Sequence, residues 1–157
     1  MSRYEEGMRL IEESCGKEKD NVIALSTIAA ASADGAARPC VRDVDAYYED
    51  GVFYVTTSAH SNKMQQIAQN SQVAFAVCFE GISGQGVGET LGWVLDPKNA
   101  ALREKLRRVF ADWYDEANHE QDEACVILAI RITQATIFRD HGAVQYHLDL
   151  VRQTEGK

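Results

Sequence analysis

The chain has 157 residues, of which 45% are hydrophobic and 25% are charged, and it contains only two prolines. This composition excludes a disordered or fibrous protein and predicts one globular domain spanning residues 1–157. Acidic residues outnumber basic residues by 24 to 16, and the resulting formal charge of -8 argues against nucleic acid or an anionic membrane as a partner.

The first predicted element is an amphipathic helix. Tyr4, Met8, Ile11 and Cys15 recur at helical spacing, and glutamates lie off this stripe. The same acids interrupt the apolar residues of MSRYEEGMRLIEESCGK, so the segment lacks the apolar core of a signal peptide or a membrane span. We therefore expect a cytoplasmic protein.

Three strands joined by tight turns are predicted next. The apolar run VIALSTIAAA (22–31) ends at the turn signal Ala33-Asp34-Gly35. The segment RPCVRDVDAYY (38–48) has the two-residue alternation of a strand, and Glu49-Asp50-Gly51 marks a turn before the strand VFYVTT (52–57). This order predicts an antiparallel meander.

The remaining elements favour a small barrel. They are a short helix NKMQQIAQN (62–70), strands QVAFAVCFE (72–80) and GVGETLGWVL (86–95), one long helix (97–118) with Trp113 on its apolar stripe, a strand (125–140) and a short seventh strand AVQYHLDL (143–150). The glycines of the fifth strand predict bulges and tight curvature. We therefore predict a mainly β, α+β fold: a small antiparallel barrel with flanking helices.

Hydroxyl groups and cations converge where the third strand meets the short helix. Thr56 and Thr57 end the strand, Ser61 lies near the helix N-cap, and Lys63 follows in the first turn. Arg42 lies on the neighbouring strand and reaches the same end of the sheet in one of the two registers. Each residue alone has an ordinary structural explanation, but together they favour a phosphate site at the start of the helix.

The cysteines and histidines do not predict a metal site. No CxxC pair and no metal-site spacing such as HExxH occurs among Cys15, Cys40, Cys78, Cys125, His60, His119, His141 and His147. We expect reduced thiols and no bound metal.

The chain resembles the pyridoxamine 5'-phosphate oxidase-like superfamily of FMN-binding split β-barrel proteins, most of all its short general-stress-protein type. The resemblance rests on the order and spacing of ADGAARPCVRDVD, EDGVFYVTTSAHSNKMQQIAQNSQVAFAV and GQGVGETLGWV. It implies a six-stranded antiparallel split β-barrel with flanking helices, a homodimer with FMN at the subunit interface and a small-molecule substrate.

The resemblance also implies which residues bind the FMN phosphate. Arg42 and Lys63 would hold it, with help from Ser61 and Thr57. Asn62, also in this segment, stands where the vitamin-metabolising oxidases usually have arginine. The chain shows no convincing match to the C-terminal segment with which those oxidases bind pyridoxamine phosphate, so we do not expect that substrate.

Four further residues are implied along the rest of the cofactor. Asp43, Val44 and Thr56 would lie along the ribityl chain and the isoalloxazine edge, and Gln85 would approach the flavin from the partner subunit. No catalytic residue is assigned, because the flavin itself carries the redox chemistry. Asp43 and Asp45 could act as general bases, but they could equally pair with Arg42 or face solvent.

Three functions remain open at this point. The first is an FMN-dependent oxidoreductase acting on an unidentified small molecule. The second is a non-catalytic flavin-binding or stress-response protein. The third is a relative that binds deazaflavin F420 or haem in the same groove.

Overall fold

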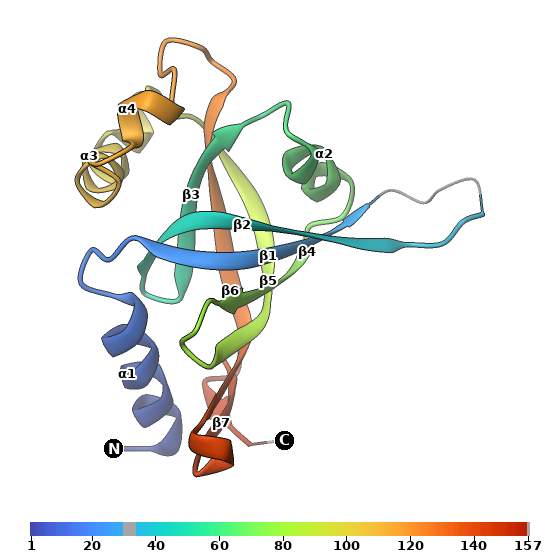
Figure 1. Cartoon of the computed structure of the whole chain (residues 1–157), viewed down its shortest axis with the longest axis vertical. Helices are drawn as coiled ribbons and strands as arrows, with labels where there is room; N and C mark the ends of the chain where they lie inside the picture. The colour runs from blue at the N-terminus through green and yellow to red at the C-terminus, as the bar shows by residue number, and fades with distance from the viewer. Residues whose placement is uncertain (30–33, 157) are drawn as a thin grey trace.

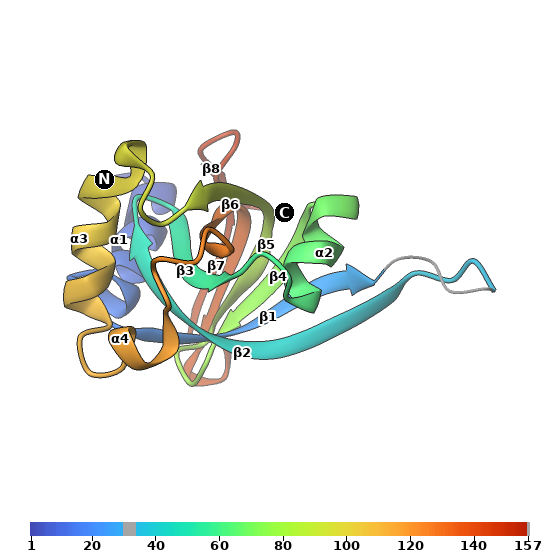
Figure 2. The same ribbon diagram turned by 90° about the horizontal axis from the view of Figure 1, so that it is seen from above.

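The computed structural model describes residues 1–29 and 34–156. Figures 1 and 2 show a central barrel with helices packed around it. The helices are α1 (Arg3–Cys15), α2 (Asn62–Gln69), α3 (Ala100–Val109) and α4 (Tyr114–Ala117), with short 3-10 turns at Pro97–Asn99 and Asp140–Gly142. The strands are β1 (Asn21–Ala29), β2 (Arg38–Glu49), β3 (Val52–Ser58), β4 (Gln72–Val77), β5 (Ile82–Trp93), β6 (Cys125–Arg139), β7 (Val144–Asp149) and β8 (Thr154–Glu155).

Six antiparallel strands close into the barrel. The strands are ordered β3-β2-β1-β4-β5-β6, and an additional pairing of β3 with β6 closes the circle. Strands β7 and β8 continue the sheet beyond β6. The predicted antiparallel barrel with flanking helices is therefore confirmed, and β8 is an element that the sequence did not predict. Residues 30, 31 and 33 of the predicted first hairpin lie outside the described residues.

Two apolar clusters hold the elements together. Inside the barrel, the alternate residues of each strand face inward, and Phe53 and Phe75 meet edge to face with ring centroids 5.3 Å apart. Outside it, α3 buries Leu106 and Phe110 against the barrel wall at Ile127. Strands β3 and β6 therefore bury apolar side chains on both of their faces.

The glycines of β5 mark its curvature, as predicted. The pairing of β5 with β6 shifts register between Gln85 and Gly86 and again between Thr90 and Trp93. Gly92, inside the second irregularity, has φ +81°, which is a conformation that favours glycine. The strand itself begins at Ile82, earlier than the predicted start at Gly86.

The prediction of one long helix over residues 97–118 is wrong. The helix α3 ends at Val109, and the chain resumes a short helix, α4, only at Tyr114. Phe110 leaves the helical conformation at φ -102° and ψ 24°, and its ring is fully buried. Burying Phe110 and stacking Trp113 on it, with ring centroids 4.6 Å apart, outweighs the local preference for a continuous helix.

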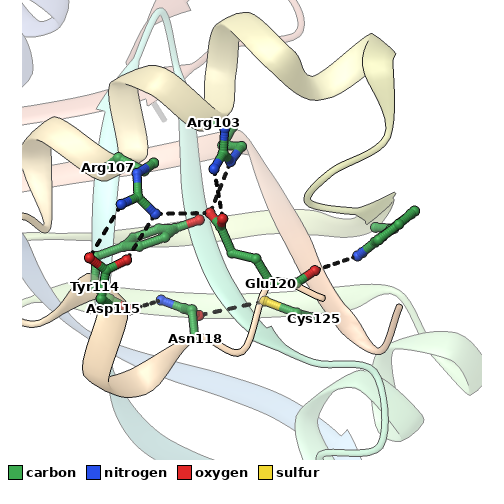
Figure 3. Close-up of polar contacts among 8 residues, drawn as sticks. Arg103, Arg107, Tyr114, Asp115, Asn118, Glu120 and Cys125 are labelled. Atoms are coloured by element: carbon green, nitrogen blue, oxygen red, sulfur yellow. Dashed lines mark hydrogen bonds and ion pairs between the residues drawn. The ribbon is translucent and has the colours of Figure 1, made fainter. Parts of the chain in front are cut away.

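The basic residues of α3 are all ion-paired. Lys105 pairs with Glu49 and Arg108 with Glu18, at 2.6 and 2.8 Å. Arg103 and Arg107 pair with Glu120, which Figure 3 shows between them. The sequence of alternating charges therefore forms a set of local ion pairs rather than a basic patch.

Membrane-spanning helices, metal-binding clusters and disulfides were each sought among the described residues. Over residues 1–29 and 34–156, no helix is long and apolar enough to cross a membrane. In the same part of the chain, no cluster of three His, Cys, Asp or Glu side chains is placed to hold a metal ion. All four cysteines are free thiols.

Candidate functional site

A cavity of about 490 Å³ lies where β3, the start of α2 and the segment leading into β6 meet. One side is lined by hydroxyl groups and an ammonium group, from Thr56, Thr57, Ser58, Ser61 and Lys63. The opposite wall is built by Trp113, Ala117, Asn118, His119, Asp122, Ala124 and Cys125. The size falls within the range of about 300–1,000 Å³ that is usual for ligand sites.

The turn between β3 and α2 leaves the start of the helix open. Ser61 is the N-cap residue of α2, as expected, but its hydroxyl donates to the carbonyl of Ser58 at 2.7 Å and does not cap the helix. Within the described chain, no side chain caps α2, and its first turn contains no acidic residue. The free N–H groups and the helix dipole therefore favour an anion at this point.

Two cations lie side by side at the same end of the barrel. Lys63 is half-buried, and both its burial and the nearby charge of Arg42 lower the pKa of its ammonium group. The guanidinium of Arg42 donates to Thr27 Oγ1 at 2.6 Å, to the Leu25 carbonyl at 3.3 Å and to Gln66 Oε1 at 3.2 Å. No carboxylate among the described residues is paired with either cation, so a negative ligand would relieve their repulsion.

The threonines at the end of β3 add uncommitted hydroxyl groups. Thr56 Oγ1 is buried and has no hydrogen-bond partner in the described structure. Thr57 Oγ1 lies 3.5 Å from Ser61 Oγ, at the limit of a hydrogen bond. A buried hydroxyl without a partner costs free energy, and a polar ligand in the cavity would recover it.

The other predicted site residues lie outside this cavity in the single chain. Asp43 is exposed on β2, opposite Ala24, whereas Val44 packs against the barrel core. Asn62 lines a separate pocket beside α2. Gln85 is exposed on the outer face of β5 and pairs with Ala74 and Gln134. The structure thus brings Thr56, Thr57, Ser61 and Lys63 together beside Arg42, and the remaining four residues lie apart from them.

The second wall of the cavity was not predicted from the sequence. In the sequence Trp113 indicates only an apolar helix stripe, and Asn118, His119 and Asp122 belong to a polar segment without a motif. The one available signal is a polar stretch, residues 118–123, directly before an apolar strand. Such a stretch indicates a loop at the end of a sheet but does not specify which side of the barrel it covers.

Glu120 anchors this wall to α3. Arg103 donates to both of its carboxylate oxygens, at 2.9 and 2.7 Å, and Arg107 donates to one of them at 3.2 Å (Figure 3). The Glu120 carbonyl also accepts a hydrogen bond from the Trp93 indole at 2.8 Å. The Arg103 hydrogen bonds are the largest cause that lowers the pKa of Glu120, to about 2. The loop is therefore held by a side chain that is ionised at neutral pH.

Comparisons by sequence identify no relative of this chain. No protein-family model matches it, and no curated protein matches it.

Comparisons by structure do find matches. The chain is similar to a general stress protein 26 from Bacillus anthracis, with TM-score 0.60, 18% identity and coverage of 86% of this chain and 92% of that one. It is similar to a pyridoxamine 5'-phosphate oxidase-related, FMN-binding protein from Nostoc punctiforme, with TM-score 0.60, 13% identity and coverage of 99% and 95%. A haem-binding protein from Mycobacterium smegmatis matches with TM-score 0.63 and 14% identity, over 89% of this chain and 57% of that one. The chain therefore has the split-barrel fold of the pyridoxamine 5'-phosphate oxidase-like proteins.

Proposed function

We propose that this protein binds FMN and acts as an oxidoreductase on a small molecule. The observation that carries the proposal is the pair of cations without a carboxylate partner, Arg42 and Lys63, beside the uncapped start of α2. A phosphate monoester carries close to two negative charges at neutral pH and has several strong acceptor oxygens. It matches two cations, free backbone N–H groups and nearby hydroxyls better than a neutral ligand would.

The roles of the individual residues follow from their positions. Lys63 and Arg42 would neutralise the phosphate, Thr57 would donate a hydrogen bond to it, and Ser61 would do so once its hydroxyl turns away from the Ser58 carbonyl. The unpartnered hydroxyl of Thr56 would bind a ribityl or phosphate oxygen. When bound, the flavin supplies hydride or electron transfer, so that these side chains need only bind and orient it.

We also propose a homodimer, and the outer face of the barrel supports it. Ten residues on this face of β1, β4, β5 and β6 carry no charge, and we call them the uncharged face: Val22, Ala24, Ser26, Ala74, Ala76, Ser83, Gln85, Gln134, Thr136 and Phe138. Val22 and Phe138 on it are 44% and 52% exposed. In a chain with 25% charged residues, a face of this width without charge favours burial against a second subunit.

The position of Gln85 fits the same arrangement. Its side chain lies on the uncharged face, away from the cavity of its own chain. The four free thiols are in keeping with a reducing, cytoplasmic location.

The first test is an absorption spectrum of the purified protein before and after FMN is added and the excess removed by gel filtration. We expect retained flavin bands at roughly 375 and 450 nm. A protein that retains deazaflavin F420 or haem instead would overturn the choice of FMN and keep the site. Turnover of a reduced nicotinamide with assorted acceptors would then separate an enzyme from a carrier of flavin.

The second test removes each cation. We expect Arg42→Ala and Lys63→Ala each to weaken FMN binding by about 1.5–3 kcal/mol, the range for hydrogen bonds to charged groups. Lys98→Ala and Arg9→Ala are the matched controls, because they remove the same charges from exposed positions outside the cavity. FMN titrations that give wild-type affinity for both site variants would exclude the proposed phosphate site.

A further inference from the structure

Arg42 begins on the inner face of the barrel wall and is held there by neutral groups. It pairs across β1 and β2 with Leu25, a fully buried core residue, so the two side chains share that face. Two backbone carbonyls, of Leu25 and Cys40, accept hydrogen bonds from its guanidinium at 3.3 Å. The side chains of Thr27 and Gln66 accept at 2.6 and 3.2 Å. None of these acceptors offsets the positive charge of Arg42.

The two side-chain acceptors are also hydrogen-bonded to each other. Thr27 comes from β1 and is fully buried, and Gln66 comes from α2, which packs beside β1 (Figures 1 and 2). Arginine has only donors, so the Thr27 hydroxyl accepts from Nη1 of Arg42, and its own proton is left for Gln66 Oε1, 2.5 Å away. The same oxygen accepts from Nη2, which closes a ring of three side chains from three elements.

This ring occupies one edge of the guanidinium and leaves another edge unused. The Nε–H group and the second N–H of Nη2 have no acceptor among the described residues. In arginine these two groups lie on one side of the planar guanidinium, at the spacing of two phosphate or carboxylate oxygens. Lys63 lies near enough for the charge of Arg42 to lower the pKa of its ammonium group. The ring therefore holds a cation with a free pair of donors in the neighbourhood of a second cation.

We propose that Thr27 and Gln66 are positioning residues that hold Arg42 with its charge intact and its Nε–Nη2 edge ready for a phosphate group. The proposal rests on the proposed function, because it names the groups that fix the phosphate-binding cation. Neutral acceptors suit this task, since a carboxylate in their place would neutralise the guanidinium and compete with the ligand. A cation that is fixed before the ligand arrives also loses less side-chain entropy on binding.

The first experiment compares FMN with riboflavin, which has the same ring and ribityl chain but no phosphate. Thr27→Val keeps the shape of the side chain and removes the hydroxyl, and Gln66→Met keeps the length and removes the acceptor. We expect each variant to bind FMN about three- to tenfold more weakly, the equivalent of one ordinary hydrogen bond, and to bind riboflavin as the wild type does. Thr27→Ser, which restores the hydroxyl, should recover most of the FMN affinity.

Two controls separate positioning from a general loss of structure. Gln69→Met makes the same substitution at an exposed position of α2 and should leave FMN affinity unchanged. In an Arg42→Ala background, Thr27→Val should cause no further loss, because the group that it positions is absent. Wild-type FMN affinity in both Thr27→Val and Gln66→Met, an equal loss of riboflavin affinity, or a full further loss in the Arg42→Ala background would each overturn the proposal.

The second experiment observes Arg42 in flavin-free protein, so that its outcome does not depend on the proposed function. A guanidinium held at both Nη groups rotates slowly about its C–N bonds, and its Nη–H groups then give separate ¹⁵N–H NMR signals, which Arg42→Ala assigns. We expect separate signals in the wild type and merged signals in Thr27→Val and Gln66→Met. Identical signals in all three proteins would overturn the proposal. If the wild type binds no FMN but the signals merge as expected, the proposed function fails and the anchoring of Arg42 stands.

Discussion

Glu120 is the residue whose charge does most to shape one wall of the cavity. Its side chain is 14% exposed, yet it carries a full negative charge because Arg103 and Arg107 surround it. Its pKa lies at about 2, below the ordinary value of 4.5, so the folded protein binds fewer protons here than the unfolded chain does. The ionised form therefore stabilises the fold above about pH 4.5, and that contribution is lost as the pH falls towards 2.

We predict that Glu120→Gln lowers the free energy of unfolding by about 1–2 kcal/mol at pH 7, less than the full pKa shift implies because the two guanidinium groups remain partly solvated. The difference from wild type should shrink as the pH is lowered from 5 towards 2. Urea unfolding at pH 7 and pH 3 measures both values. Asp115→Asn, which removes a 78% exposed carboxylate from the same Arg107, should change stability by no more than about 0.5 kcal/mol.

At the scale of elements, β5 depends on close approach of its backbone to β6. A Cβ atom on Gly84 would lie 2.1 Å from the carbonyl oxygen of Gln134 and 2.9 Å from the ring of Phe75. The backbone of the paired strand cannot move away without breaking the β5–β6 ladder. A side chain of any size is therefore excluded at this position.

We predict that Gly84→Ala lowers the free energy of unfolding by about 2–3 kcal/mol, at the upper end of the range for overpacked cores. Ser83→Ala, on the neighbouring exposed position, is the control and should change it by less than about 0.5 kcal/mol. Chemical denaturation of both variants and the wild type measures the two changes in the free energy of unfolding. Equal stability would mean that β5 relaxes at Gly84 more easily than its contacts imply.

The break in the predicted helix after α3 also depends on how elements pack together. Residues 97–118 have the composition and apolar stripe of one helix, and no proline or glycine interrupts them after Pro97. The break occurs because Phe110 is buried in the apolar cluster, and Trp113 stacks on it while donating a hydrogen bond to Asp20. Local propensity cannot reveal a packing partner that is 93 residues away in sequence.

At the scale of the whole molecule, we expect a homodimer formed through the uncharged face. We predict that Ala76→Glu, in the centre of the uncharged face, converts the dimer to a monomer, because a buried carboxylate without a partner costs several kcal/mol. It should also reduce FMN retention, since the proposed cofactor site is completed by the second subunit. Sedimentation analysis and flavin absorbance report the two effects.

Ala101→Glu is the control for this experiment. It makes the same change at an exposed position on α3 and should preserve the oligomeric state. If Ala76→Glu and wild type sediment as the same species, the uncharged face is not the dimer interface.

The sequence by itself determined most of the barrel and half of the cavity. The six strands, the antiparallel meander of the first three and the short helix α2 follow from two-residue alternation, turn signals and helical spacing, all of which act between residues near each other in the chain. Thr56, Thr57, Ser61 and Lys63 could be predicted as one group because a single strand-to-helix turn carries them. Adding Arg42 to this group required only the register of the adjacent strand.

Only the tertiary structure decided the other half of the cavity. The wall formed by Trp113, Asn118 and His119 and the hydrogen bond from Trp113 to Asp20 join segments that are distant in sequence. The same holds for Glu120, whose partners Arg103 and Arg107 lie on the other side of the break in the predicted helix. Barrel closure brings these segments together, and the burial that results shifts pKa values and breaks a helix in ways that no local pattern encodes.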